Sequence, residues 1–284
     1  MNEVQYWVNG RQGALVNAAE RALQYGDGLF ETIRVRHARP EYLARHMQRL
    51  SAGCERLKFP AVDWALIRQE LVKLAGQQKD AVLKYILSRG VGGRGYQPGP
   101  ELEVTRIASI HPLPRWPSDP EQNGVRTRIC TTALATQPLL AGIKHLNRLE
   151  QVMARTEWDD ADIVEGFMLD QDQRLIEATM SNVFIVNGRE LLTPELSNCG
   201  VAGVMRSVIL DLAATLGFKT RVQQLTLDDV KTSQEVFICN SLAGVWPVVH
   251  IEGLGEFGIG RITRQLQVAM QADDSEDNGN WYIT

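Results

Sequence analysis

Two stretches in the first third of the chain carry apolar residues at the spacing of an amphipathic helix. The first predicts a helix over residues 42–57, with apolar positions at Leu43, Met47, Leu50 and Cys54. The second begins at Asp63, a residue type that caps helix N-termini, and continues with Trp64, Ile67, Leu71 and Leu74. Both predicted helices are therefore amphipathic.

Runs of β-branched and apolar residues predict strands on both sides of these helices. They cover residues 4–9, 30–35, 81–87 and 104–110. The proline-rich segment 111–120 follows the last of them. Such a segment is typical of a connector, and we therefore expect a domain boundary near residue 116.

Strands dominate the pattern after residue 120. We expect them at 125–131, 167–169, 175–177, 183–186, 191–193, 236–240 and 245–250, with helices over 147–158 and 204–216. Asn187-Gly188 predicts a two-residue hairpin. The whole pattern predicts an α+β protein with a smaller N-terminal αβ domain over residues 1–116, a larger β-rich domain with helices over 117–272 and an acidic tail over 273–284.

Composition and charge limit the classes of partner. The 284 residues are 44% hydrophobic and 23% charged, which is the composition of an ordinary globular protein. A formal net charge of −4 does not favour nucleic acid or an anionic membrane, so we expect a small-molecule substrate. The four cysteines form no CxxC pair, and we expect neither a disulfide framework nor a metal site. The N-terminal residues lack a signal-peptide pattern, which favours a cytoplasmic protein.

The stretch from Gly90 to Gly95 matches the pattern GxGxxG after a predicted strand. A dinucleotide-binding loop needs a helix to follow it, but residues 97–100 are Gln-Pro-Gly-Pro and lead into another strand. Two interpretations remain. The stretch is either an ordinary loop or a mobile lid on which Arg89 and Arg94 bind substrate carboxylates.

Lys144 and Glu177 both lie in apolar surroundings. Burial of the Lys144 ammonium would lower its pKa and suit a Schiff-base nucleophile, although lysines near a helix start more often reach solvent. Glu177 lies in an apolar strand, where a carboxylate is costly unless a cationic or protonated group pairs with it. Neither residue identifies a reaction by itself.

A phosphate could bind where the helix over 204–216 begins. The main-chain N–H groups of Val204 and Met205 follow Gly203 there and have no partner within a helix. Ser241 at the end of a predicted strand offers a hydroxyl to the same anion. Each feature is also common in proteins that bind no ligand.

Taken together, these segments resemble the fold-type IV pyridoxal-phosphate enzymes, which include branched-chain and D-amino-acid aminotransferases and aminodeoxychorismate lyases. The matching segments follow the family's order along nearly the whole chain, at 25–34, 46–50, 144–150, 177–184, 193–206 and 235–241. The resemblance implies the family's two-domain fold, a smaller αβ sandwich and a larger β-rich domain with helices. It also implies a homodimer.

The resemblance assigns roles to the candidate residues. Lys144 matches the lysine that forms the Schiff base with pyridoxal 5'-phosphate, and Glu177 matches the carboxylate that pairs with the pyridine nitrogen. The phosphate group would be bound by Arg49, by the N–H groups of Val204 and Met205, and by Ser241.

Within the family, residues 142–151 and 88–96 are most similar to the aminodeoxychorismate lyases. That similarity implies conversion of 4-amino-4-deoxychorismate to 4-aminobenzoate and pyruvate in folate biosynthesis, with Lys144 as the base. This substrate has two carboxylates, which Arg89 and Arg94 would bind. Phe30 stands where D-amino-acid aminotransferases carry a tyrosine, which favours the lyase.

Two other functions remain open. One is an aminotransferase acting on branched-chain or D-amino acids, because it shares the cofactor-binding residues. The other is a binding protein without catalytic activity, in which Lys144 and Glu177 are only structural.

Overall fold

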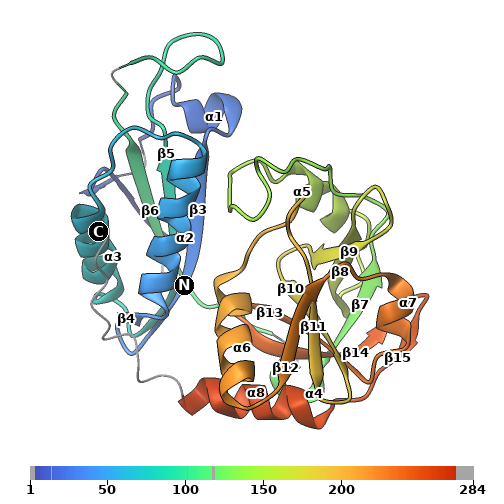
Figure 1. Cartoon of the computed structure of the whole chain (residues 1–284). Coiled ribbons are helices and arrows are strands. Elements are labelled where there is room, and N and C mark those ends of the chain that lie inside the picture. The colour runs from blue at the N-terminus through green and yellow to red at the C-terminus, as the bar shows by residue number, and fades with distance from the viewer. Residues whose placement is uncertain (1–3, 14, 101, 117–118, 273–284) are drawn as a thin grey trace. The chain divides into compact units, whose positions relative to one another are not determined.

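The computed structural model of the chain describes residues 4–13, 15–100, 102–116 and 119–272 (Figure 1). The acidic tail expected over 273–284 lies outside them. The described residues divide into two compact units: unit 1 holds 4–115 and 143–147, and unit 2 holds 116–142 and 148–272. The domains expected from the sequence would place the segment Ile143–Asn147 in the C-terminal domain, whereas its contacts place it in unit 1.

Unit 1 is built on a six-stranded antiparallel sheet in the order β2-β1-β6-β5-β3-β4. The strands are β1 (Gln5–Val8), β2 (Arg11–Gln12), β3 (Gly28–Arg36), β4 (Arg39–Pro40), β5 (Asp80–Ser88) and β6 (Thr105–His111). Its helices are α1 (Arg21–Tyr25), α2 (Leu43–Arg56) and α3 (Trp64–Ala75). The helices predicted at 42–57 and from Asp63 are therefore confirmed, and the Asp63 carboxylate caps α3 by accepting the Leu66 N–H at 2.9 Å.

Helix α2 packs closely on β3, as the two neighbouring ribbons in Figure 1 show. Alternate residues of β3 point toward it, so Leu29, Ile33 and Val35 are buried. Gly53 permits the close approach, because a Cβ atom there would lie 2.8 Å from Leu29 Cδ1. This short separation between helix and strand brings polar side chains of α2 within reach of β3.

Unit 2 contains a nine-stranded sheet in the order β12-β11-β10-β13-β14-β7-β8-β9, with β15 paired to β14. The strands are β7 (Val125–Ile129), β8 (Ile163–Leu169), β9 (Leu175–Ala178), β10 (Asn182–Asn187), β11 (Glu190–Pro194), β12 (Lys219–Gln223), β13 (Glu235–Asn240), β14 (Gly244–Ile251) and β15 (Gly255–Glu256). The two-residue hairpin predicted near Asn187-Gly188 is confirmed, but its loop lies one position later, at Gly188-Arg189, because Asn187 is the last residue of β10 and pairs with Glu190.

Five helices accompany this sheet: α4 (Pro120–Asn123), α5 (Leu149–Arg155), α6 (Val204–Thr215), α7 (Leu227–Lys231) and α8 (Arg261–Ala272). Helices α6 and α8 contact each other, and both contact β13. The core of unit 2 is apolar and includes Phe167, Ile185, Ile238 and Val248, each fully buried. The α+β expectation is thus confirmed, and no helix within the described ranges is long and apolar enough to cross a membrane.

Candidate active site

Lys144 lies against β3 in unit 1. Its carbonyl accepts the Phe30 N–H at 3.0 Å, and the Leu146 N–H donates to the Gly28 carbonyl at 3.0 Å. These main-chain bonds fix the segment at the lysine and two residues beyond it. The Lys144 Nζ lies 4.4 Å from the centroid of the Phe30 ring, so the structure brings together two residues that the sequence suggested separately.

A second cation faces the same ring. Lys84 on β5 lies beside Thr32 of β3, and its Nζ is 5.6 Å from the Phe30 centroid. Sequence reasoning did not identify Lys84, because only the pairing register of β3 and β5 places it on the face that carries Phe30.

Arg49 on α2 forms an ion pair with Glu31 of β3. Its Nε donates to Glu31 Oε1 at 2.8 Å, and its Nη2 donates to Glu31 Oε2. His46, one turn earlier on α2, places Nδ1 2.6 Å from Glu31 Oε2. Glu31 and His46 are buried, and the side chain of Arg49 is 12% exposed.

This cluster is charged at neutral pH. Burial alone raises the pKa of the Glu31 carboxyl, but Arg49 and His46 outweigh that effect and hold the pKa at about 2. Burial lowers the pKa of His46, and Glu31 opposes the change only in part. Near pH 7 we therefore expect an ionised Glu31–Arg49 pair beside a neutral imidazole.

Arg89 is buried and bonded on several sides. Its Nε donates to Asp27 Oδ2 at 2.8 Å, while Nη1 and Nη2 donate to the carbonyls of Lys58 and Leu57, each at 2.7 Å. These bonds join three separate segments of unit 1, so the structure gives Arg89 a clear role in holding the start of the glycine-rich stretch.

Arg94, in contrast, is exposed. The stretch that carries it is attached to α1: Arg21 Nη1 donates to the Gly95 carbonyl at 3.1 Å, and the Gly95 N–H donates to Tyr25 Oη at 3.1 Å. Gly92 packs on Arg21, since a Cβ atom there would lie 2.8 Å from Arg21 Cδ. The glycines thus let this stretch lie close against α1 and still leave Arg94 accessible.

Glu177 is buried on β9 in unit 2 and is 4% exposed. Its Oε2 accepts the Val201 N–H at 2.8 Å, and its Oε1 accepts from Gln151 Nε2 at 3.3 Å. Burial lowers the pKa of Arg148, and the negative charge of Glu177 opposes that shift, so Arg148 is a cationic neighbour of the kind that this carboxylate needs. The sequence pattern identified neither Gln151 nor Arg148.

Helix α6 begins beside Glu177. Gly203 is its N-cap residue with φ −66° and ψ 142°, and no side chain caps the helix in the part of unit 2 that is described. Asn182 Oδ1 accepts the Gly203 N–H at 3.1 Å, and Asn182 Nδ2 donates to the Val201 carbonyl at 2.8 Å. Val201 therefore connects Glu177 to the start of the helix.

Ser241 follows β13 in a turn that Asn240 holds. Asn240 Oδ1 accepts the N–H groups of Leu242 and Ala243, and its Nδ2 donates to Ser181 Oγ at 3.1 Å. Ser181 precedes Asn182, so a chain of hydrogen bonds and neighbouring residues links the Ser241 turn to the start of α6. Unit 2 thus gathers Glu177, Val204, Met205 and Ser241 at one end of β10.

The family model for class IV aminotransferases matches residues 28–251. The chain belongs to this family. The match includes every candidate residue named above from Phe30 to Ser241, and the expected membership of the fold-type IV enzymes is confirmed.

The relatives of this class IV chain include lyases and aminotransferases. It is 37% identical to the aminodeoxychorismate lyase of Vibrio harveyi, over 92% of this chain and 98% of that protein. It is 29% identical to the D-alanine aminotransferase of Bacillus licheniformis, over 92% of each. The solved 4-amino-4-deoxychorismate lyase from Pseudomonas aeruginosa matches with a TM-score of 0.91 and 46% identity, over 96% of this chain and 99% of that chain.

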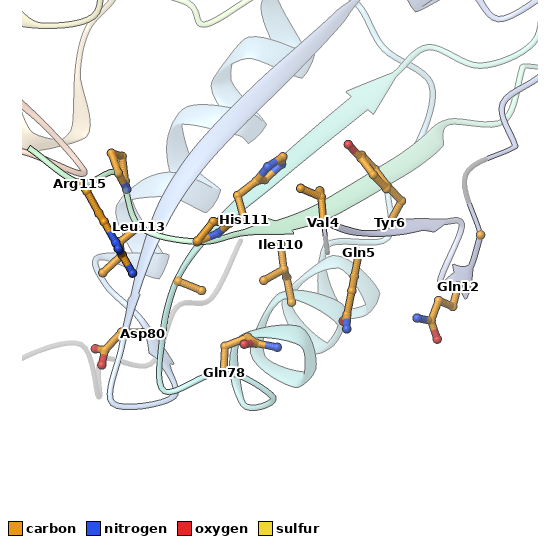
Figure 2. Close-up of a pocket in the computed structure, with 14 residues that line it drawn as sticks. Val4, Gln5, Tyr6, Gln12, Gln78, Asp80, Ile110, His111, Leu113 and Arg115 are labelled. Atoms are coloured by element: carbon orange, nitrogen blue, oxygen red, sulfur yellow. The ribbon is translucent and has the colours of Figure 1, made fainter. Parts of the chain in front are cut away.

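A wide cavity of about 980 Å³ opens elsewhere on unit 1 of this class IV chain (Figure 2). Its lining includes Gln5, Gln12, Asp80 and Arg115, all exposed polar side chains. None of the candidate site residues lines it, and we assign it no function.

Proposed function

We propose that the chain is a pyridoxal-phosphate-dependent lyase that converts 4-amino-4-deoxychorismate to 4-aminobenzoate and pyruvate in folate biosynthesis. The observation that carries this proposal is the 46% identity to a solved 4-amino-4-deoxychorismate lyase across 96% of the chain. The curated lyase at 37% identity supports the same reaction. The D-alanine aminotransferase relative, at 29%, supports only the alternative.

The residues present fit the cofactor chemically. Lys144 supplies an amine for the aldehyde, and Glu177 supplies a carboxylate for the pyridine nitrogen. Arg49, the N–H groups of Val204 and Met205, and the Ser241 hydroxyl would hold the phosphate. The start of α6 supports this assignment, because Gly203 leaves it without a side-chain cap and an anion can satisfy its first N–H groups.

When bound, pyridoxal phosphate withdraws electrons from the carbon next to the substrate amino group. Glu177 would hold a proton at the pyridine nitrogen, and its bond from the Val201 N–H keeps the carboxylate in place. Lys144 would remove the proton at C4 of the substrate ring. Loss of that proton and cleavage of the ring C–O bond to the enolpyruvyl group make the ring aromatic and give 4-aminobenzoate. The enolpyruvate that leaves takes up a proton and becomes pyruvate.

We assign the two arginines of the glycine-rich stretch to different tasks. Arg94 is the candidate for a substrate carboxylate, because it is exposed on a stretch that is fixed at Gly95. The bonds of Arg89 to two carbonyls and Asp27 favour a role in holding that stretch. Phe30 would orient the Lys144 amine, which lies over its ring.

We also propose that the protein is a cytoplasmic homodimer. Helix α5 supports a subunit interface, because Leu149, Val152 and Met153 on it are 76%, 54% and 58% exposed. Exposed apolar side chains gathered on one short helix are typical of protein–protein contacts. Light scattering coupled to size-exclusion chromatography tests this proposal, and a monomeric mass would contradict it.

The deciding experiment measures 4-aminobenzoate released from 4-amino-4-deoxychorismate by the purified protein, with pyridoxal phosphate and without a keto acid. We expect product from the wild type and from Lys73→Ala, a control at an exposed lysine on α3, and none from Lys144→Ala. A yellow, borohydride-sensitive protein that makes no product, but transfers amino groups to a keto acid, would establish the aminotransferase instead. A colourless protein without cofactor would favour the binding protein.

A further inference from the structure

Glu31 is a carboxylate in an otherwise apolar row. On the face of β3 that meets α2, its neighbours along the strand are Leu29 and Ile33, and all three residues are at most 2% exposed. Placing a charge there is unfavourable unless partners compensate for the lost hydration. Glu31 must therefore serve its partners, because an apolar residue would suit this position better for packing alone.

The partners of Glu31 come from one face of α2. His46 and Arg49 are three residues apart on the helix, so both side chains reach the same strand position. Arg49 uses Nε and Nη2 on the two carboxylate oxygens, which fixes the plane of the guanidinium and turns Nη1 away from Glu31. His46 holds Oε2 from a third direction at 2.6 Å.

The cluster also lies near the Lys144 segment of unit 1. The positive charge of Lys144 is close enough to contribute to the lowered pKa of His46. The same β3 strand contacts both groups, since Glu31 binds Arg49 and the neighbouring Phe30 N–H bonds to the Lys144 carbonyl. The side chain that sets the orientation of Arg49 therefore belongs to the strand residue directly after the one that bonds the Lys144 main chain.

We propose that Glu31 is a positioning residue for the cofactor phosphate, which it serves by holding the Arg49 guanidinium in a fixed orientation before the cofactor binds. This proposal rests on the proposed function, in which Arg49 binds that phosphate. An arginine that is already oriented loses less conformational freedom on binding, so the cofactor binds more tightly.

Two effects of Glu31 on the phosphate have opposite signs. Its fixed hold on Arg49 favours binding, whereas its own negative charge repels the phosphate. Replacing Glu31 by glutamine removes the charge and weakens the two-bond contact with Arg49. The sign of the change in affinity therefore shows which effect is larger, and positioning requires weaker binding in the variant.

The test compares pyridoxal phosphate with pyridoxal, which lacks the phosphate, by titrating cofactor-free protein and following Schiff-base absorbance. For Glu31→Gln we expect pyridoxal phosphate to bind about tenfold more weakly, with pyridoxal binding unchanged. The matched control is Glu70→Gln. Glu70 accepts a similar pair of bonds from Arg106, at 2.9 and 3.0 Å, but has no contact with Arg49, so both affinities should stay the same.

Unchanged or tighter binding of pyridoxal phosphate to Glu31→Gln would overturn the proposal, and so would equal weakening of both ligands. Glu31→Asp provides a second variant if the glutamine variant does not fold, because it keeps the charge and shortens the reach. We expect the same selective loss. Arg49→Lys separates this proposal from the proposed function: if it too leaves the ratio of the two affinities unchanged, the assignment of Arg49 to the phosphate fails. If Arg49→Lys selectively weakens pyridoxal phosphate binding and the Glu31 variants do not, only the role of Glu31 is refuted.

Discussion

Replacing Gly203 by alanine tests the hydrogen bonds that hold the start of α6. Alanine adopts φ −66° and ψ 142° without strain, so we expect no destabilisation from the backbone conformation. The new Cβ would lie 2.0 Å from Asn182 Oδ1, which forces that amide to move. Its displacement breaks the bond from the Gly203 N–H and the bond to the Val201 carbonyl.

Each of these partly buried hydrogen bonds contributes about 1 kcal/mol to stability, so we expect Gly203→Ala to lower the free energy of unfolding by about 2 kcal/mol. In a chain of 284 residues that corresponds to a fall of about 3 °C in melting temperature. The cofactor should also bind more weakly, because the N–H groups of Val204 and Met205 follow the displaced residue.

Differential scanning calorimetry of the cofactor-free protein measures the first effect, and titration with pyridoxal phosphate measures the second. Gly258→Ala is the matched control, since among the described residues no atom beyond Gly258 and its two chain neighbours lies within 4 Å of a Cβ atom there. The double variant Gly203→Ala with Asn182→Ala should be no less stable than Asn182→Ala alone, because both changes remove the same bonds. A Gly203→Ala protein with wild-type melting temperature and affinity would refute the reasoning.

Three further predictions concern unit 1. Arg89→Lys should lower the free energy of unfolding in urea by about 2 kcal/mol, because one ammonium cannot reproduce the bonds to the Leu57 and Lys58 carbonyls; unchanged stability would contradict the role of Arg89 in the loop. Arg94→Ala should raise KM for 4-amino-4-deoxychorismate without changing the melting temperature, and an unchanged KM would remove Arg94 from the site. The pKa of the Glu31 carboxyl is about 2 in the folded protein, against an ordinary value of 4.5. Its ionisation should therefore add about 3 kcal/mol to the free energy of unfolding above pH 4.5, and this contribution should be lost as the pH falls toward 2. Urea unfolding of Glu31→Gln and wild type at pH 7 and pH 3 checks this, and a stability difference that does not shrink at pH 3 would contradict it.

Local patterns in the sequence predicted the features of the fold and the site that depend only on residues close together in the chain. The helix α2 follows from the spacing of Met47 and Leu50, and its amphipathic pattern needs no knowledge of the rest of the fold. The candidates Lys144 and Glu177 could be selected because each is a charge in an apolar stretch.

Contacts between distant segments could not be predicted in this way. Glu31 meets Arg49 only because Gly53 lets α2 approach β3 closely, and Asn182 reaches Gly203 across a gap of 21 residues in the chain. Such pairs depend on strand register and on the distance between helix and sheet, which no local spacing encodes. The same limit hid the bonds of Arg89 to Leu57 and Lys58.

The segment Ile143–Asn147 has a consequence for how the polypeptide can be made and divided. Unit 1 is not a continuous piece of chain, because its last strand ends at His111 and its lysine segment arrives more than thirty positions later. During translation the set of contacts of unit 1 cannot be completed until Asn147 has left the ribosome. An N-terminal fragment ending at Arg115 would lack both Lys144 and the bonds that its segment makes to Gly28 and Phe30. Neither a genetic split nor a protease cut near residue 116 can therefore release unit 1 with all its parts.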